Sequence, residues 1–385
     1  MNNTFSGANL NNIKEMNISA VLKTIFEHEG ISRTDIASST EMSCAFVTKV
    51  LTNLTSKRIV LESKNSAVDR GRPKVSLCFN YDRFVMVGLR INAKYISSAL
   101  CSSRGELLCH YSSSIEDRKN GEEIYIKCCE LIDLALSHKK DKIVLGIGVA
   151  APGPLPPEHD RVTVINESNF ADFKDIALIE RLEKEYGVSV VLMHDAHCGA
   201  LNEYIFRETK ERYRNIVFIA TDNGVGAGII IDGKPYNGSG FAGEISNMII
   251  GRDDELVPLS AVLSQKKLIS DCGCESITEV IERVRIDDTV CCEHFDRFIR
   301  YLTVAVSNFI TTVSPEAIVI SDSIALLKER VEKLCKETLS TLLPEEYKSS
   351  VEIIVRPYSK HSVLRGACGA ILHKALEEPC KYFEL

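Results

Sequence analysis

The first residues of the chain show three stretches with helical periodicity. Apolar residues recur at helical spacing from Ile18 to Phe26, and the pattern stops at Gly30, a residue type that often ends a helix. Two shorter periodic stretches follow Ser32 and Ser43, and serine is a favoured helix-capping residue. The pattern predicts three consecutive helices.

Two apolar runs, residues 59–62 and 75–79, follow the third helix and are separated by a polar loop. Such runs are typical of two paired strands. Three helices followed by a two-stranded wing predict a winged helix-turn-helix domain over residues 1–80. The alternative is a small helical protein-interaction module whose polar loop is a solvated linker.

The third helix has one apolar side and one small, polar side, which suits a helix that enters the major groove. The candidate DNA-contacting residues of this side are Ser43, Cys44, Ala45, Thr48 and Lys49. In the wing loop, Arg70, Arg72 and Lys74 lie beside a glycine and a proline. A flexible basic turn of this kind can enter a narrow, A·T-rich minor groove.

From residue 81 onward, apolar strands alternate with helices, which favours layered α/β structure. The pattern starts afresh near Asn215, again with two apolar runs around a glycine-rich turn. We therefore expect two similar lobes with a cleft between them. The expected bounds are about 81–195 plus the last helix for lobe one, and about 196–365 for lobe two, within a body of residues 81–385.

Composition agrees with a folded protein of several domains, because 385 residues exceed what one compact core usually holds. No stretch reaches the roughly 18 apolar residues of a membrane span, and the amino terminus lacks the features of a signal peptide. We expect a cytoplasmic protein with no membrane partner.

Charge and cysteine content refine this picture slightly. Residues 1–80 carry 10 Lys and Arg against 7 Asp and Glu, whereas the rest carry 36 against 46, so a mildly basic head precedes an acidic body. The 14 cysteines are expected to be reduced thiols. A metal site could be imagined at Cys272, Cys274, Cys291, Cys292 and His294. The spacing of these residues, however, matches no familiar zinc finger.

Four motifs together resemble the ROK family of bacterial sugar kinases and transcriptional repressors, in particular its xylose- and N-acetylglucosamine-type repressors. They are GIGVAAPGP at 146–154, HDAHCGALNEY at 194–204, DNGVGAGIIIDGKPYNGSGFAGEISNM at 222–248 and PEAIVIS at 315–321. The resemblance implies an α/β fold with two lobes, of the actin-like (ribonuclease H-like) ATPase type, behind the winged helix-turn-helix.

The resemblance also implies where a kinase of this family would hold ATP, and this sequence departs there. Arg90 replaces an aspartate, and Asn92, Ala93 and Lys94 replace the Gly-Gly-Thr turn that cradles phosphates. Residues 321–323 replace a second glycine-rich turn, although the turn at 222–228 keeps three glycines. We expect the first turn to be a plain hairpin, with no catalytic residues, no cofactor and no enzyme activity.

The family's sugar site is retained in part. The resemblance places Asp195 at the catalytic base, and Asn169 and Glu244 at sugar contacts, while Asn247 stands in place of a histidine zinc ligand. Residues 251–260 lack the family's cysteine cluster, so no metal is expected. The four are candidate effector-binding residues, because buried ligand hydroxyls need polar partners. Asp195 has a second interpretation as a helix cap, and a ligand of another kind, or none, stays open.

These features favour a sequence-specific repressor of carbohydrate genes that binds an A·T-rich inverted repeat in double-stranded DNA as a homodimer, possibly a tetramer. A sugar or sugar phosphate in a catalytically dead cleft would control it by shifting the population of lobe arrangements. The alternatives are a DNA-binding regulator that senses no small molecule and an active sugar kinase.

Overall fold

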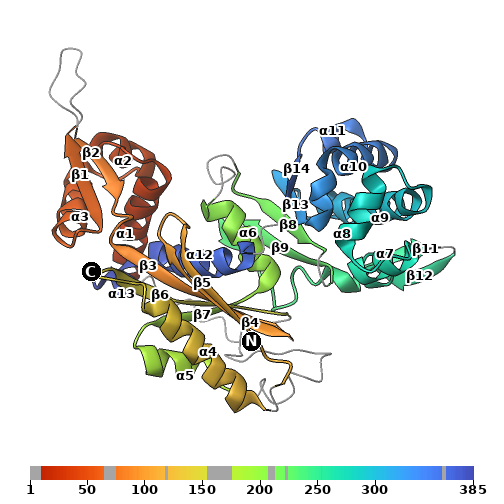
Figure 1. The fold of residues 1–385 in the computed structure, drawn as a ribbon. Helices are drawn as coiled ribbons and strands as arrows, with labels where there is room; N and C mark the ends of the chain where they lie inside the picture. The colour runs from red at the N-terminus through yellow and green to blue at the C-terminus, as the bar shows by residue number, and fades with distance from the viewer. Residues whose placement is uncertain are drawn as a thin grey trace, which may run out of the picture.

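The computed structural model describes residues 10–64, 75–92, 94–117, 120–153, 176–206, 213–221, 224–252, 254–357 and 361–385. Figure 1 shows a small amino-terminal head beside a body of two lobes, and the last helices of the chain return to the head. The mixed α/β class expected from the sequence is confirmed.

The head contains three helices and a two-stranded wing. The helices are α1 (Leu10–Glu27), α2 (Arg33–Thr40) and α3 (Cys44–Ser56), and the wing strands are β1 (Val60–Lys64) and β2 (Val75–Phe79). Ser32 and Ser43 cap α2 and α3, as predicted, by accepting the backbone N–H groups of Asp35 and Phe46. The strands pair antiparallel from Val60–Phe79 to Lys64–Val75, so β1 starts one residue later and ends two residues later than predicted. Its partner strand fixes this register.

Lobe one is built on a five-stranded sheet in the order β5-β4-β3-β6-β7. The strands are β3 (Phe84–Ile91), β4 (Tyr95–Ser102), β5 (Leu107–Ser114), β6 (Ile143–Ala151) and β7 (Ser189–His194). The helices α4 (Gly121–Leu136) and α5 (Leu178–Tyr186) share a core with one face of this sheet. The opposite face packs on α12 (Ser362–Glu377), near the carboxyl end of the chain.

Lobe two repeats this plan with a sheet in the order β10-β9-β8-β13-β14. The strands are β8 (Ile216–Ala220), β9 (Gly226–Ile231), β10 (Lys234–Pro235), β13 (Ala317–Asp322) and β14 (Glu352–Pro357). In each sheet a three-stranded antiparallel meander is extended by two parallel strands. The restart that the sequence shows near Asn215 is therefore a repeat of the same sheet topology.

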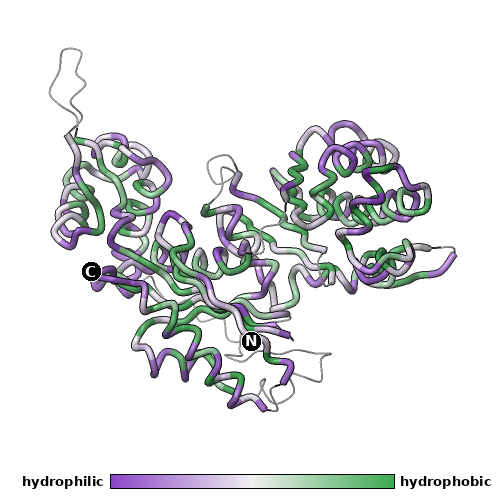
Figure 2. The backbone as a smooth tube through the Cα atoms, in the orientation of Figure 1, coloured by the Kyte–Doolittle hydropathy of each residue, from purple (hydrophilic) through white to green (hydrophobic). Residues whose placement is uncertain are grey.

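The outer part of lobe two holds most of the remaining elements (Figure 1). They are η4 (Ile245–Asn247), β11 (Ile249–Arg252), β12 (Glu255–Pro258), η5 (Leu259–Ala261), α7 (Gln265–Asp271), α8 (Ile277–Arg285), α9 (Thr289–Thr312), η6 (Ser323–Leu327), α10 (Lys328–Leu342) and α11 (Glu345–Lys348). Apart from α11, they share a core with the sheet face that carries Val217 and Ile219. Figure 2 shows the corresponding green apolar strands beneath helices of mixed polarity.

The two lobes meet through α6 (Asp195–Phe206), which packs against α12 and against β9. Glycines allow this close packing. A Cβ added to Gly366 of α12 would lie 1.7 Å from the carbonyl oxygen of Cys198, and one added to Gly228 of β9 would lie 2.0 Å from that of Ala196. Helix α6 is thus held between one element of each lobe.

The head and the body share one continuous apolar core. Phe383 of the last helix, α13 (Pro379–Phe383), packs its ring against Phe79 of the wing and Phe84 of lobe one, with ring centroids 6.3 and 5.2 Å apart. On the same junction Arg104 forms an ion pair with Glu29 at 2.9 Å. Because these contacts cross the junction, the body sets the orientation of the head.

Candidate nucleic-acid interface and effector site

Helix α3 turns its apolar side to the core of the head and its small, polar side to solvent. Val47, Val50, Leu51 and Leu54 are buried. The five residues singled out as DNA contacts on this helix and at its cap are all exposed: Ser43, Cys44, Ala45, Thr48 and Lys49. Their role in DNA binding stays a prediction, and their exposure is what that role requires.

The threonine hydroxyl groups on this surface donate hydrogen bonds to the backbone of their own helix. Thr48 donates its proton to the carbonyl oxygen of Cys44 at 2.8 Å, and Thr52 donates to that of Thr48 at 2.9 Å. A threonine tied back in this way still offers lone pairs and a methyl group. Thr48 is therefore suited to accept a hydrogen bond from a base amino group or to contact a thymine methyl.

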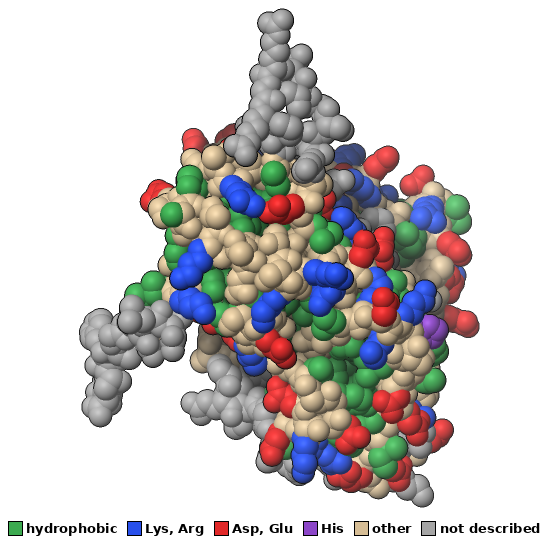
Figure 3. Space-filling model, turned by 90° about the vertical axis from the view of Figure 1, so that its left-hand side faces the viewer, with side chains coloured by type: hydrophobic (Ala, Val, Ile, Leu, Met, Phe, Trp, Pro, Cys, Tyr) green, Lys and Arg blue, Asp and Glu red, His purple; other side chains and the backbone are tan. Residues whose placement is uncertain are grey.

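The other candidate DNA contacts, Arg70, Arg72 and Lys74, lie outside the described residues. Figure 3 views the molecule from the side of the head and shows Lys and Arg side chains interspersed with uncharged side chains and with Asp and Glu on that face. Dispersed cations of this kind suit contacts to a phosphate backbone.

The turn between β3 and β4 is a hairpin connection, as predicted. The strands pair antiparallel up to Ile91 and Ile96. The side-chain oxygen of Asn92 accepts the backbone N–H groups of Lys94 and Tyr95, each at 2.9 Å. Both amides are thus used within the turn instead of facing outward toward a phosphate group.

Arg90, at the end of β3, forms an ion pair with Asp195, at the start of α6. Its Nε and Nη2 donate to the same carboxylate oxygen, Oδ2, at 3.3 and 3.0 Å, and Nη1 donates to the hydroxyl oxygen of Tyr95 at 3.1 Å. The Arg90 side chain is 9% exposed and that of Asp195 is 22% exposed. The cation that replaces the kinase aspartate is therefore held against the residue aligned with the catalytic base.

This geometry differs from the helix-capping interpretation of Asp195. Asp195 is the first residue of α6, and its Oδ2 is engaged by Arg90. Its Oδ1 is buried and has no hydrogen-bond partner in the described part of the chain. The carboxylate thus keeps one oxygen that can accept a hydrogen bond from a ligand.

Three side chains lie together where β7 ends and α6 begins: His194, His197 and Glu244. Asp195 follows His194 directly in the chain, and we call these four residues the polar cluster. The Nε2 of His194 lies 3.9 Å from Oε1 of Glu244, and the two imidazole rings are 5.8 Å apart. A Cβ added to Gly153 would lie 2.3 Å from Glu244 Oε1, so only a glycine leaves room there. The cluster joins the carboxyl end of β7 to the loop before η4.

His197 is neutral in this environment. Its Nε2–H donates to the carbonyl oxygen of Tyr236 at 3.0 Å, and burial lowers the pKa of the ring to about 4. In this tautomer Nδ1 is an acceptor, and it has no partner within the described residues. Glu244 Oε1 is also buried and has no hydrogen-bond partner within the described residues. The cluster therefore presents acceptors that need donors.

The remaining candidate effector residues are placed differently. Asn247 is exposed at the end of η4, and Asn169 lies outside the described residues. Residues 251–260, where the family's cysteine cluster would fall, form most of the β11–β12 hairpin and the start of η5. Within the described ranges no three His, Cys, Asp or Glu residues are arranged to hold a metal ion. The residues present do not fit the family's zinc.

The cysteine-rich segment considered as a metal site is a group of thiols in the outer core of lobe two. The Sγ atoms of Cys274 and Cys291 are 4.0 Å apart, and Cys272 is buried beside them. Burial raises the pKa of Cys272 to about 12, which keeps this thiol protonated.

Sequence reasoning missed His194 and His197 as members of the site, although both stand in the quoted HDAH motif. It also missed the contact between Arg90 and Asp195, which are 105 residues apart. Strand alternation gives a partial signal, because Arg90 lies on the same face of β3 as Met86 and Gly88, the face that packs on α12.

Comparison with known proteins identifies relatives of the whole chain. The model of the ROK family matches residues 86–375. The xylose repressor of Bacillus subtilis strain 168 is 23% identical over 95% of this chain and 97% of its own length, and that of Staphylococcus xylosus is 26% identical over the same shares. NagC, a DNA-binding transcriptional dual regulator of Escherichia coli K12, is 21% identical over 90% of each chain.

Solved structures give the same fold. A ROK family transcriptional regulator homologous to the Escherichia coli MLC protein has a TM-score of 0.83 and 23% identity, and covers 97% of this chain and 100% of its own. A ROK family glucokinase from Streptomyces griseus, solved with glucose and AMPPNP, has a TM-score of 0.61 and 19% identity, and covers 74% of this chain and 98% of its own. The 74% of this chain that the kinase covers is close to the share that the body would fill without the head.

Proposed function

The chain belongs to the ROK family, and we propose that it is a sequence-specific DNA-binding transcriptional regulator, a repressor of carbohydrate-metabolism genes. The observation that carries this proposal is the similarity to named repressors over 95% of the chain, with the head included. The structure supports it with a winged helix-turn-helix whose third helix exposes its small, polar side.

The proposed operator is an A·T-rich inverted repeat bound by a homodimer. A twofold-symmetric dimer places its two recognition helices on half-sites separated by about one or more helical turns of DNA. The body fixes the orientation of each head through the shared core. A change in the body can therefore alter the spacing of the two heads.

The proposed effector is a sugar or sugar phosphate at the polar cluster. Asp195 Oδ1, Glu244 Oε1 and His197 Nδ1 are acceptors without donors in the described part of the chain. A ligand with several hydroxyl groups supplies donors at close spacing, and an unpaired buried acceptor costs about 1–3 kcal/mol. Because two of the relatives are xylose repressors, D-xylose is the first probe.

We further propose that the protein has no sugar kinase activity. A kinase must neutralise and position the γ-phosphate, and its base must reach the sugar hydroxyl. Here the guanidinium of Arg90 engages Asp195, and the β3–β4 turn directs two of its amides to Asn92. ATP turnover measured against a panel of sugars tests this point, and product formation would overturn it.

DNA binding is tested with purified full-length protein and fragments from the neighbourhood of its gene. A gel shift with an A·T-rich inverted repeat, weakened in a variant that carries Lys49→Gln, is the expected result. Failure to shift any genomic fragment would contradict the proposal. A thermal-shift screen of sugars and sugar phosphates, repeated with the bound fragment, then separates a sensing regulator from one that senses nothing.

A further inference from the structure

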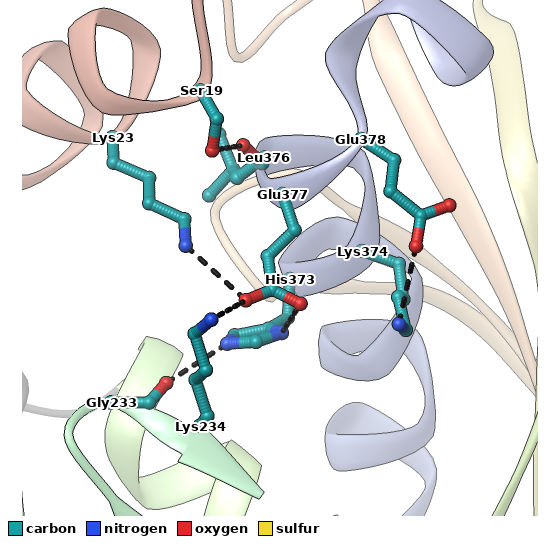
Figure 4. Close-up of polar contacts among 9 residues, drawn as sticks. All are labelled: Ser19, Lys23, Gly233, Lys234, His373, Lys374, Leu376, Glu377 and Glu378. Carbon is teal, nitrogen blue, oxygen red and sulfur yellow. Dashed lines mark hydrogen bonds and ion pairs between the residues drawn. The ribbon is translucent and has the colours of Figure 1, made fainter. Parts of the chain in front are cut away.

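Glu377, at the end of α12, lies where the head, lobe one and lobe two meet (Figure 4). Its Oε1 is 3.4 Å from Nζ of Lys23, on α1 of the head, and also 3.4 Å from Nζ of Lys234, on β10 of lobe two. One carboxylate oxygen is thus shared by cations from two separate parts of the molecule.

The tip of the β9–β10 hairpin brings lobe two to this point. Asp232 and Gly233 both have positive φ angles, 50° and 75°, as a two-residue hairpin turn requires. Lys234 follows the turn directly, and the carbonyl oxygen of Gly233 accepts a hydrogen bond from Nε2 of His373 at 2.9 Å. The hairpin tip is therefore tied to α12 twice.

The head is tied to the same turn of α12. Ser19 of α1 donates a buried hydrogen bond to the carbonyl oxygen of Leu376 at 2.7 Å, and Lys23 lies one helical turn further along α1. The Glu377 side chain is 18% exposed. Burial raises its pKa, but His373, Lys23 and Lys234 together hold the pKa below its ordinary value, so the carboxylate is ionised.

The same hairpin begins beside the polar cluster. Gly226, the first residue of β9, lies close to His194: a Cβ added there would be 3.7 Å from the imidazole ring. The six residues of this strand span about 17 Å from Gly226 to Ile231, at the hairpin tip. Close contact between Gly228 and Ala196 couples this strand to α6 along the way. A displacement of β9 at the cluster is therefore passed on to Lys234.

We propose that Glu377 couples the position of lobe two to the DNA-binding head, by sharing one carboxylate oxygen between Lys234 and Lys23. Movement of the hairpin tip changes how strongly Glu377 attracts Lys23. It therefore changes how tightly α1 is bound to α12. Loss of the carboxylate leaves two lysines and a histidine facing one another, which loosens the junction further. The regulatory meaning of this coupling rests on the proposed function; the coupling itself does not.

The test is hydrogen–deuterium exchange of the full chain, read by mass spectrometry over residues 19–27. Lys234 forms its ion pair with Glu377 of α12, yet we expect Lys234→Gln to speed exchange in this segment of the head about two- to fivefold, the scale of a partly exposed ion pair. Lys234 is 65% exposed, so the variant should fold. The matched control is Lys374→Gln, because Lys374 pairs with Glu378 at 3.3 Å on the same helix, and its charge lowers the pKa of Glu377 less than those of His373, Lys23 and Lys234 do.

A second variant separates coupling from general loosening. If both lysines act through Glu377, adding Lys234→Gln to a chain that already carries Glu377→Gln should not speed exchange in residues 19–27 any further. The proposal is overturned if Lys234→Gln alone matches the Lys374→Gln control, or if its effect persists in full without the carboxylate. The assay uses neither DNA nor sugar, so a negative result would not contradict the proposed function. Likewise, a protein that bound no DNA or sugar could still show this coupling.

Discussion

Replacing Arg90 with leucine removes the cation that faces Asp195 and strands a carboxylate in a largely buried site. The two side chains are 9% and 22% exposed, so solvent screens their attraction poorly. Removing one partner of a fully buried ion pair costs about 3–5 kcal/mol, because the remaining charge is uncompensated. Since Asp195 keeps some contact with solvent, we expect a loss of about 2–3 kcal/mol in stability.

A second substitution identifies the origin of this loss. Asp195→Asn keeps the shape of the side chain and removes the charge. We therefore expect the double variant Arg90→Leu/Asp195→Asn to be more stable than Arg90→Leu alone, by about 1 kcal/mol or more. Such recovery arises only if the cost of Arg90→Leu is electrostatic and not a packing defect.

Thermal unfolding followed by far-UV circular dichroism measures the effect, since the chain contains no tryptophan for fluorescence. A loss of about 2–3 kcal/mol corresponds to a fall of about 3–5 °C in Tm for a body of this size. Glu122→Gln breaks the exposed Arg181–Glu122 pair and should leave Tm within about 1 °C of the wild type. A wild-type Tm for Arg90→Leu, or a double variant no more stable than Arg90→Leu, would refute the reasoning.

Four further outcomes are expected. Lys49→Gln should weaken operator binding and lower the slope of log affinity against log salt by about one, measured by fluorescence anisotropy, whereas Lys333→Gln on lobe two should change neither. His197 has a pKa of about 4, below its value in the unfolded chain, so the unfolded chain takes up the proton first as pH falls. Stability should therefore fall by about 3 kcal/mol in total between about pH 6.5 and about pH 4, and His197→Gln should flatten this part of a Tm–pH curve. Gly366→Ala should lower Tm strongly, because its Cβ would lie 1.7 Å from a carbonyl oxygen of α6, while Gly251→Ala, with nothing within 4 Å, should not. Excess EDTA should leave Tm unchanged, and a fall would reveal a metal site that the donor set does not indicate.

Local chemistry in the sequence predicted local structure well. The caps of α2 and α3 were placed at the correct serines, because capping depends on residues three positions apart. β2 was predicted at its observed bounds, and β1 was not, because the end of β1 is set by pairing with β2. The repeat of the sheet was visible as a repeated pattern of apolar runs.

Contacts between distant segments could not be predicted in this way. Arg90 meets Asp195 because the end of β3, the central strand of the lobe-one sheet, lies beside the start of α6, and no local pattern specifies that contact. Glu377 is one acidic residue at the end of a mostly buried helix, and only the fold brings a lysine from the head and one from lobe two to it. Family resemblance locates residues of known role, but it is silent on partners that the family's motif does not contain.

Neutralising Asp195 from within the chain changes what the polar cluster can bind. A kinase of this family obtains positive charge at this place with its magnesium–nucleotide, whereas here Arg90 supplies it permanently. The free Oδ1 of Asp195 can then accept from a neutral hydroxyl without any nucleotide present. Binding of an uncharged sugar should accordingly depend little on ionic strength, because no net charge enters the site. Operator binding should depend on it strongly. The body and the head should thus respond to different variables, and β9, which starts at the polar cluster and ends beside the head, is the element that can connect them.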